Sequence, residues 1–192
     1  MTDKISDDPA VQAASVILSW TEVNERELLA KLAREVPAGG KILEIGALYG
    51  GATAVLALAN PQAVLTSIDE FSWRPEGYPE VGADVMKANL EKAGVKNKYT
   101  IIAEASEKIG PTWSTLVNLL WIDGGHSYEY VFRDLWMFGP WAQVIALHDY
   151  GNPFWESIKQ AVDDFLISTR AQARPMRVDE VVGTAAVLRR ST

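Results

Sequence analysis

The chain has 192 residues, no cysteine and a formal net charge of −7. This length provides one domain with a full core, and the lack of cysteine excludes disulfides, thiol nucleophiles and cysteine-based metal sites. An acidic chain is poorly suited to neutralising phosphates, so we expect no nucleic acid partner. The polar N-terminus resembles no secretory signal, and no apolar run approaches the ~20 residues of a membrane span. We therefore expect a cytoplasmic protein without membrane contact.

Residues 1–37 are predicted to form a helical segment that packs on the domain spanning 38–192. Apolar residues recur at helical spacing over 9–35, with Leu28, Leu29 and Leu32 as the densest group. Pro37 and the glycines that follow it end this helix.

Strands and helices alternate after Lys41. The predicted strands are 41–46, 64–69, 99–104, 117–122, 144–147, 178–182 and 185–188, and the predicted helices are 50–60, 80–93, 127–137 and 155–168. Such alternation indicates a parallel sheet covered on both faces. The last two strands have no helix between them, and Gly183 favours a hairpin turn. The predicted fold class is therefore α/β: a doubly wound, Rossmann-like, mostly parallel seven-stranded sheet with an antiparallel edge.

The ends of the first two strands have the pattern of a nucleoside site. The first reads Glu44-x-Gly46-x-x-x-Gly50, where the glycines allow close approach of a ligand to the backbone. Asp69 ends the second strand, close to the ~20 residues after Gly46 at which an acid contacts ribose hydroxyls. The third glycine of dinucleotide sites is missing, and Glu44 favours a cofactor that carries an ammonium and a sulfonium. Alternatively, the glycines ease packing and Asp69 caps a turn.

Further motifs follow at later strand ends: Ile122-Asp-Gly-Gly-His-Ser-Tyr128, then Asp134, then His148-Asp149. Together with the first two, they resemble the motifs of class I S-adenosylmethionine-dependent methyltransferases. More narrowly, they are similar to the small group related to macrocin O-methyltransferase and the cephalosporin hydroxylase-like proteins. The resemblance covers about 38–190 and implies a methyltransferase fold with S-adenosylmethionine as its cofactor. One departure is Gly139-Pro-Trp-Ala142, where many relatives have Pro-Gly-Gly.

The resemblance also implies where the cofactor binds. The methionine part would lie near Glu44, Gly46, Ala47, Gly50 and Asp123, the ribose at Asp69, the adenine beside Glu70 and Phe71, and its edge at Glu104, Ala105 and Ser106.

The chain has two histidines, and both are predicted to lie just beyond strand ends. His126 and His148 stand beside Asp123 and Asp149, and these four are the candidate catalytic residues. Such a set suits Mg²⁺ or Mn²⁺, and the resemblance implies that Asp123 and Asp149 bind a metal in some relatives, with His148 as a less constant neighbour. Two alternatives stay open: either histidine acts as a general base without a metal, or Asp123 and His126 only fix the turn before a helix capped by Ser127.

The expected reaction is methyl transfer to an oxygen of a small hydroxylated acceptor, either a sugar or a phenolic compound. Aromatic side chains in the loops 71–79 and 151–155 suit such rings. Seven tryptophans are many for this length and favour a homodimer. The competing hypotheses are an NAD-dependent oxidoreductase and a non-catalytic nucleoside-binding module.

Overall fold

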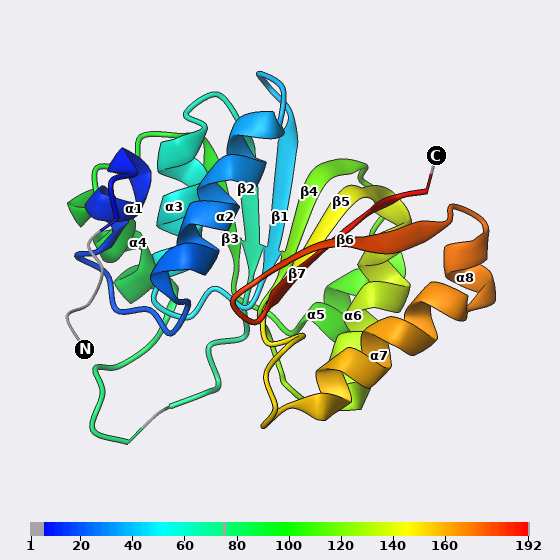
Figure 1. The fold of residues 1–192 in the computed structure, drawn as a ribbon. Coiled ribbons are helices and arrows are strands. Elements are labelled where there is room, and N and C mark those ends of the chain that lie inside the picture. The colour runs from blue at the N-terminus through cyan, green and yellow to red at the C-terminus, as the bar shows by residue number, and fades with distance from the viewer. Residues whose placement is uncertain (1–5, 75, 192) are drawn as a thin grey trace.

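The computed structural model describes residues 6–74 and 76–191, so the first five residues of the predicted helical segment and Pro75 of the loop 71–79 lie outside it. The strands are β1 (Lys41–Ile45), β2 (Val64–Ile68), β3 (Tyr99–Ile102), β4 (Val117–Ile122), β5 (Ala142–Leu147), β6 (Met176–Val182) and β7 (Ala185–Arg190). They form one seven-stranded sheet in the order β3-β2-β1-β4-β5-β7-β6 (Figure 1).

The pairing confirms the predicted fold class. Strands β1 to β5 run parallel, whereas β7 is antiparallel to β5 and β6 is antiparallel to β7. The chain leaves β1 towards β2 and β3, then returns to place β4 on the other side of β1. The strand order therefore reverses between β1 and β4, and ligands of open α/β sheets bind at such a switch point, beyond the carboxyl ends of the strands.

Helices cover both faces of the sheet. They are α1 (Pro9–Ala14), α2 (Val23–Glu35), α3 (Gly51–Ala59), α4 (Ala83–Lys92), α5 (Ser106–Ile109), α6 (Tyr128–Phe138), α7 (Glu156–Ile167) and α8 (Thr169–Gln172), with 3-10 turns η1 (Gly110–Thr112) and η2 (Gly139–Trp141). Helices α1 to α4 lie on one face and α5 to α8 on the other (Figure 1).

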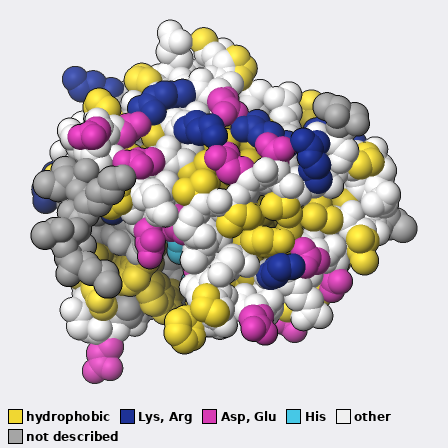
Figure 2. Space-filling model, in the orientation of Figure 1, with side chains coloured by type: hydrophobic (Ala, Val, Ile, Leu, Met, Phe, Trp, Pro, Cys, Tyr) yellow, Lys and Arg dark blue, Asp and Glu magenta, His cyan; other side chains and the backbone are white. Residues whose placement is uncertain are grey.

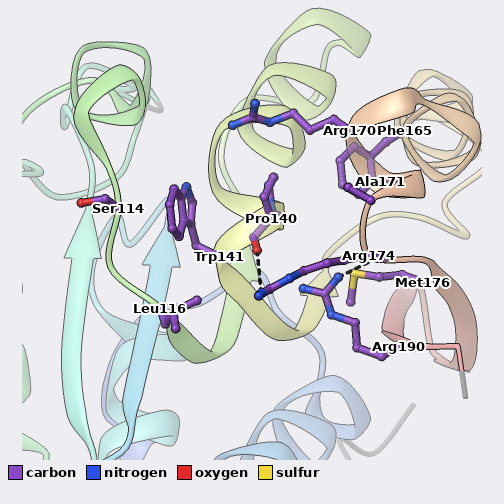
Figure 3. Close-up of a pocket in the computed structure, with 12 residues that line it drawn as sticks. Ser114, Leu116, Pro140, Trp141, Phe165, Arg170, Ala171, Arg174, Met176 and Arg190 are labelled. Carbon is purple, nitrogen blue, oxygen red and sulfur yellow. Dashed lines mark hydrogen bonds between the residues drawn. The ribbon is translucent and has the colours of Figure 1, made fainter.

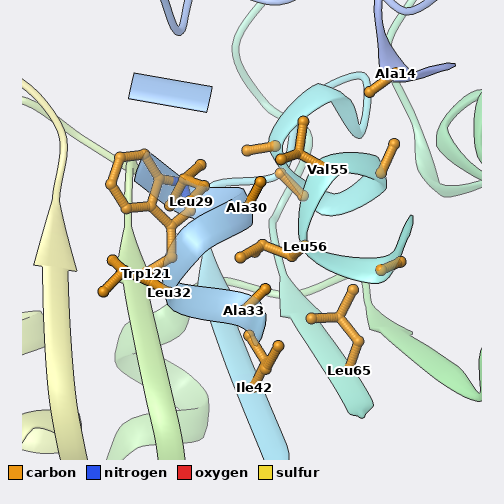
Figure 4. Close-up of a cluster of buried hydrophobic side chains, with 14 of the residues drawn as sticks. Ala14, Leu29, Ala30, Leu32, Ala33, Ile42, Val55, Leu56, Leu65 and Trp121 are labelled. Atoms are coloured by element: carbon orange, nitrogen blue, oxygen red, sulfur yellow. The ribbon is translucent and has the colours of Figure 1, made fainter. Parts of the chain in front are cut away.

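Each face has its own hydrophobic core, because successive strand side chains point in opposite directions. On β4, Trp121 packs into the core beneath α2 and α3, while Leu120 and Ile122 belong to the core beneath α6 and α7. Figure 4 shows Trp121 beside Leu29 and Leu32 of α2. The strands are packed on both faces by buried side chains, and this packing holds in place the strand ends where the polar residues lie.

The N-terminal segment differs from the single helix predicted over 9–35. It forms two helices, α1 and α2, and α2 restarts at a capping box in which Glu22 and Glu25 each accept from the other's backbone amide. Periodicity alone did not show this break, because apolar residues such as Leu18 continue through the connection. The helices α5 and α8 were not predicted, since four residues are too few for a periodic pattern. Within 6–74 and 76–191, no helix has the length and apolar character needed to cross a bilayer.

Candidate active site

The loop between β1 and α3 lies at the switch point and contains both predicted glycines. Gly46 has φ +86°, and a Cβ there would lie 2.1 Å from the carbonyl oxygen of Asp123. Gly50 has φ +87°, and its Cβ would lie 3.0 Å from Met86 on α4. A side chain at position 46 would therefore collide with the backbone after β4, whereas at Gly50 the main constraint is the left-handed backbone, because the side chain of Met86 is flexible. Leu48 between them also has a positive φ, of 48°, a conformation that costs energy outside glycine.

Asp69 fastens this loop to the end of β2. Its Oδ2 accepts hydrogen bonds from the backbone amides of Ala47 and Leu48, both at 2.7 Å, and its Oδ1 accepts one from Phe71 at 2.6 Å. Asp69 therefore caps a turn and stays half-buried at the strand end. A carboxylate has about four lone-pair positions, so the side chain has acceptor capacity left for a ligand hydroxyl.

Glu44 lies fully buried between β1, β2 and α3. Its Oε2 accepts from Thr53 and Ser67, both at 2.5 Å, whereas its Oε1 has no hydrogen-bond partner. Burial is the main cause that raises the pKa of Glu44 to about 7, and nearby Asp123 and Asp69 add to it. A buried carboxylate oxygen without a partner is unusual, and it leaves one acceptor beneath the loop for a water or a cation.

The residues predicted around the adenine differ in burial and in the partners that they contact. Phe71 is buried in the core on the face of the sheet covered by α1 to α4, and Glu70 beside it is exposed. Glu104 pairs on the surface with Lys108, at 2.7 Å. Ser106, which begins α5, donates from Oγ to Asp134 on α6 at 2.6 Å. Ala105, between Glu104 and Ser106, is the N-cap residue of α5.

The four predicted catalytic residues do come together at the ends of β4 and β5. His148 Nδ1 lies 3.2 Å from Asp123 Oδ1 and 3.2 Å from Asp149 Oδ2, without hydrogen-bond geometry to either. His126 Nε2 lies 3.5 Å from Asp149 Oδ2, and its ring packs against Trp155 with centroids 5.0 Å apart. Asp149 has a left-handed backbone (φ 59°). Figure 2 shows a histidine beside acidic side chains at a hollow of the surface.

A fifth member of this cluster, Glu25 of α2, was not predicted. Its Oε2 lies 3.0 Å from His148 Nε2, and its Oε1 accepts from the backbone amide and the hydroxyl of Thr184, at 2.8 and 2.7 Å. The available clue was its spacing: Glu25 lies three, four and seven residues before Leu28, Leu29 and Leu32, on the buried stripe of the helix. A charged residue on such a stripe needs a buried partner.

The cluster shifts the pKa values of its members strongly. Burial alone would lower the pKa of His148, but the carboxylates of Asp123, Asp149 and Glu25 raise it to about 12. Burial would raise the pKa of Glu25 and of Asp149, but the nearby imidazole of His148 lowers both to about 2, together with a hydrogen bond from Thr184 to Glu25 and one from Asn152 to Asp149. The imidazole thus lies in a strongly cation-favouring environment.

The same environment fits a divalent cation. Asp123, His126 and His148 each offer a ligand atom within 4.8 Å of the others, among the residues that the structure describes. His148 Nδ1 is buried and has no hydrogen-bond partner, while Nε2 faces the carboxylate of Glu25. Metal-binding histidines commonly donate their second N–H to a carboxylate in this way. The carboxylates suit Mg²⁺ or Mn²⁺, whereas imidazole nitrogens are more commonly ligands of zinc or iron.

A cavity of about 450 Å³ lies away from this cluster. It opens near the amino ends of β4 and β5, between Leu116, Trp141, Phe165 and Arg174 (Figure 3). Its lining, among the residues that the structure describes, contains no acid and no histidine. The cluster around Asp123 lies at the opposite end of the strands.

Comparison with known proteins agrees with the geometry. Residues 43–150, more than half of the chain, match a family described as a methyltransferase domain, whereas no curated protein is significantly similar to the chain in sequence. Among solved structures, a putative O-methyltransferase from Klebsiella pneumoniae is similar (TM-score 0.66, 19% identity, covering 98% of this chain and 92% of that one).

Two further structures come from natural-product pathways. One is the O-methyltransferase TomG from Streptomyces achromogenes, involved in tomaymycin synthesis and solved with SAM (TM-score 0.59, 19% identity, 98% of this chain and 92% of that one). The other is CalS11, a TDP-rhamnose 3′-O-methyltransferase of calicheamicin biosynthesis (TM-score 0.59, 20% identity, 85% and 76%). These likenesses establish the fold, and the family match removes the oxidoreductase hypothesis. The chain belongs to the methyltransferase-domain family, and its fold is that of the class I methyltransferases.

Proposed function

We propose that the protein transfers a methyl group from S-adenosylmethionine to a hydroxyl oxygen of a small molecule. The observation that carries this proposal is the cluster of Asp123, His126, His148 and Asp149 at the strand ends, beside the loop that Asp69 fastens. It supplies carboxylates and imidazoles where a hydroxyl must lose its proton. TomG, which has the same fold, binds SAM.

The cofactor would lie over the loop 46–50. Asp69 has lone pairs left for the ribose hydroxyls after binding three backbone amides. The Oε1 of Glu44 has no hydrogen-bond partner, and a nearby ammonium would lower the raised pKa of this carboxyl group by stabilising its ionised form. Glu44 would act through a water molecule, since its side chain has no exposed surface.

Methyl transfer is an in-line displacement. A lone pair of the acceptor oxygen forms the new O–C bond while the C–S bond breaks, so the sulfonium becomes a neutral thioether and the hydroxyl proton must leave. Alignment of the two reactants supplies several kcal/mol of the barrier reduction. His126 is the proposed proton acceptor, because it is partly exposed and lies 3.5 Å from Asp149, whereas His148 retains its proton up to high pH.

A divalent cation bound by Asp123, Asp149 and the Nδ1 of His148 would lower the pKa of the acceptor hydroxyl. His126 would then either complete the ligand set or remove the proton, and Trp155 limits its motion by packing against the ring. A sugar or phenolic acceptor is supported by the aromatic side chains at this edge: Phe154 is 87% exposed and Trp155 is 42% exposed. CalS11 acts on a sugar nucleotide.

The test is a methyl-transfer assay with S-adenosylmethionine against a panel of sugars and phenols. We expect S-adenosylhomocysteine release with at least one hydroxylated acceptor, loss of activity in EDTA and recovery with Mn²⁺ or Mg²⁺. Full activity in EDTA, combined with a loss of about 10²-fold or more in His126→Asn, would assign the chemistry to the histidine base alone. Activity that survives both treatments, or methylation of amines only, would contradict the proposal.

A further inference from the structure

Glu25 reaches the candidate active site from a part of the chain outside the matched family region. It lies near the start of α2, whereas the family match begins at residue 43. Its side chain has no exposed surface and ends between the end of β5 and the hairpin that joins β6 to β7. Glu25 therefore connects three separate segments at one carboxylate.

Each oxygen of this carboxylate has a defined set of donors. Oε1 accepts from the amide and the hydroxyl of Thr184, while Oε2 accepts from the amide of Glu22 at 2.9 Å and lies 3.0 Å from His148 Nε2. The hairpin approaches closely, since a Cβ on Gly183 would lie 2.9 Å from Oε1. Both oxygens are held by backbone amides, so the carboxylate cannot turn away from His148 without losing hydrogen bonds.

We propose that Glu25 is a positioning residue, whose carboxylate accepts the Nε2–H of His148 and so keeps Nδ1 facing Asp123 and Asp149. The role of that Nδ1 in methyl transfer rests on the proposed function, but the hydrogen bond itself does not. An acceptor at Nε2 requires that this nitrogen bears a proton. Whether a proton or a metal ion then occupies Nδ1, the ring orientation is set by α2.

An amide at position 25 cannot reproduce this arrangement. Glutamine has one acceptor oxygen and one NH₂ group, whereas the backbone amides of Thr184 and Glu22 each need an acceptor on a different oxygen. The oxygen would face Thr184, which offers two donors, and the NH₂ would face His148. The Nε2–H of His148 would then lose its acceptor, and the proton or the ring would have to move.

The experiment is ¹⁵N–¹H correlation spectroscopy of the histidine rings in the full-length protein, which has only two histidines. The signals are assigned with His126→Asn. In the wild type we expect a protonated, slowly exchanging Nε2 on His148. In Glu25→Gln we expect loss of this Nε2–H signal and a changed Nδ1 shift.

Thr184→Val is the matched control. It removes one hydroxyl that also binds Glu25 but retains the backbone amide and both carboxylate oxygens, so the His148 signals should stay as in the wild type. An unprotonated Nε2 in the wild type would overturn the proposal, even if Glu25→Gln failed to fold. Unchanged ring signals in folded Glu25→Gln would also overturn it. The spectra require neither cofactor nor turnover, so the result is separate from the success or failure of the methyl-transfer assay.

Discussion

Asp134 lies beneath the predicted adenine side of the site, with 2% of its surface exposed. Burial raises the pKa of Asp134 from 3.8 to about 6, although Ser106 donates to it. Because the folded pKa lies above the unfolded one, the contribution of Asp134 to stability is present below about pH 3.8 and is lost as the pH rises through about 6. At neutral pH the ionised carboxylate therefore destabilises the fold.

We expect Asp134→Asn to stabilise the protein above pH 6, by up to about 3 kcal/mol, and to have little effect near pH 4. An asparagine oxygen can still accept from Ser106. Urea unfolding of both proteins from pH 4 to pH 8 measures the difference. Parallel stability curves across that range would show that the carboxyl group does not titrate as described.

Asp69 and Glu70 are adjacent acids, and the structure separates their roles. Asp69 is tied to the loop by three amides, whereas Glu70 is exposed. We expect Asp69→Asn to weaken S-adenosylhomocysteine binding by at least about 10-fold, because an amide cannot accept from both sides, and Glu70→Gln to leave it within about twofold. Calorimetry measures both.

A ribose contact can be distinguished from loop anchoring with a 2′,3′-dideoxy analogue of S-adenosylhomocysteine. If Asp69 binds the hydroxyls, Asp69→Asn should weaken the analogue much less than it weakens the parent ligand. Equal weakening of the two ligands would limit Asp69 to fastening the loop. Weakening by Glu70→Gln alone would assign the ribose to Glu70.

At the level of single residues, the sequence predicted which side chains gather at the strand ends, but not every residue that contacts them. Asp123, His126, His148 and Asp149 each follow a strand of a parallel sheet, so their proximity follows from the fold class. Glu25 could not be placed in the same way. Its contact depends on how α2 packs across the sheet, which local sequence does not determine.

Among the elements, the junction of β1 with α3 depends on a glycine, which has no side chain. Gly46 and Gly39 both have a positive φ, but a Cβ on Gly46 would enter the backbone of Asp123, whereas one on Gly39 meets nothing within 4 Å. The two positions therefore separate steric overlap from backbone strain.

We expect Gly39→Ala to cost about 1–2 kcal/mol, from the left-handed conformation alone, and Gly46→Ala to cost a further 1–3 kcal/mol or more, roughly the cost of overpacking a closed site. Chemical denaturation measures both. If the two variants were equally stable, the end of β1 would not lie against β4 as closely as the structure has it.

The alternation of strands and helices could be predicted from the sequence. So could the antiparallel end, because the connection between β6 and β7 around Gly183 is too short for a helix. The order of the strands could not be predicted, since each connection has the same local pattern whichever neighbour it reaches. The break between α1 and α2 was hidden because the capping residues Glu22 and Glu25 also fit a continuous helix.

On the scale of the whole molecule, the cluster of acids and histidines and the 450 Å³ cavity lie at opposite ends of the sheet. The carboxyl ends of β1, β2, β4 and β5 bring together acids and histidines, while the 450 Å³ cavity near Trp141 has none. The homodimer expected from the sequence stays a prediction, and four tryptophans, Trp20, Trp73, Trp136 and Trp155, are at least 37% exposed. Light scattering of the purified protein measures its mass.

The most direct measurement for the whole account is calorimetric titration of the wild-type protein with S-adenosylmethionine, S-adenosylhomocysteine and NADH. The account predicts that both sulfur nucleosides bind one site per chain, with affinities in the micromolar to millimolar range of enzyme ligands, and that NADH does not compete. Binding of NADH, or no heat from either sulfur nucleoside at millimolar concentration, would contradict it.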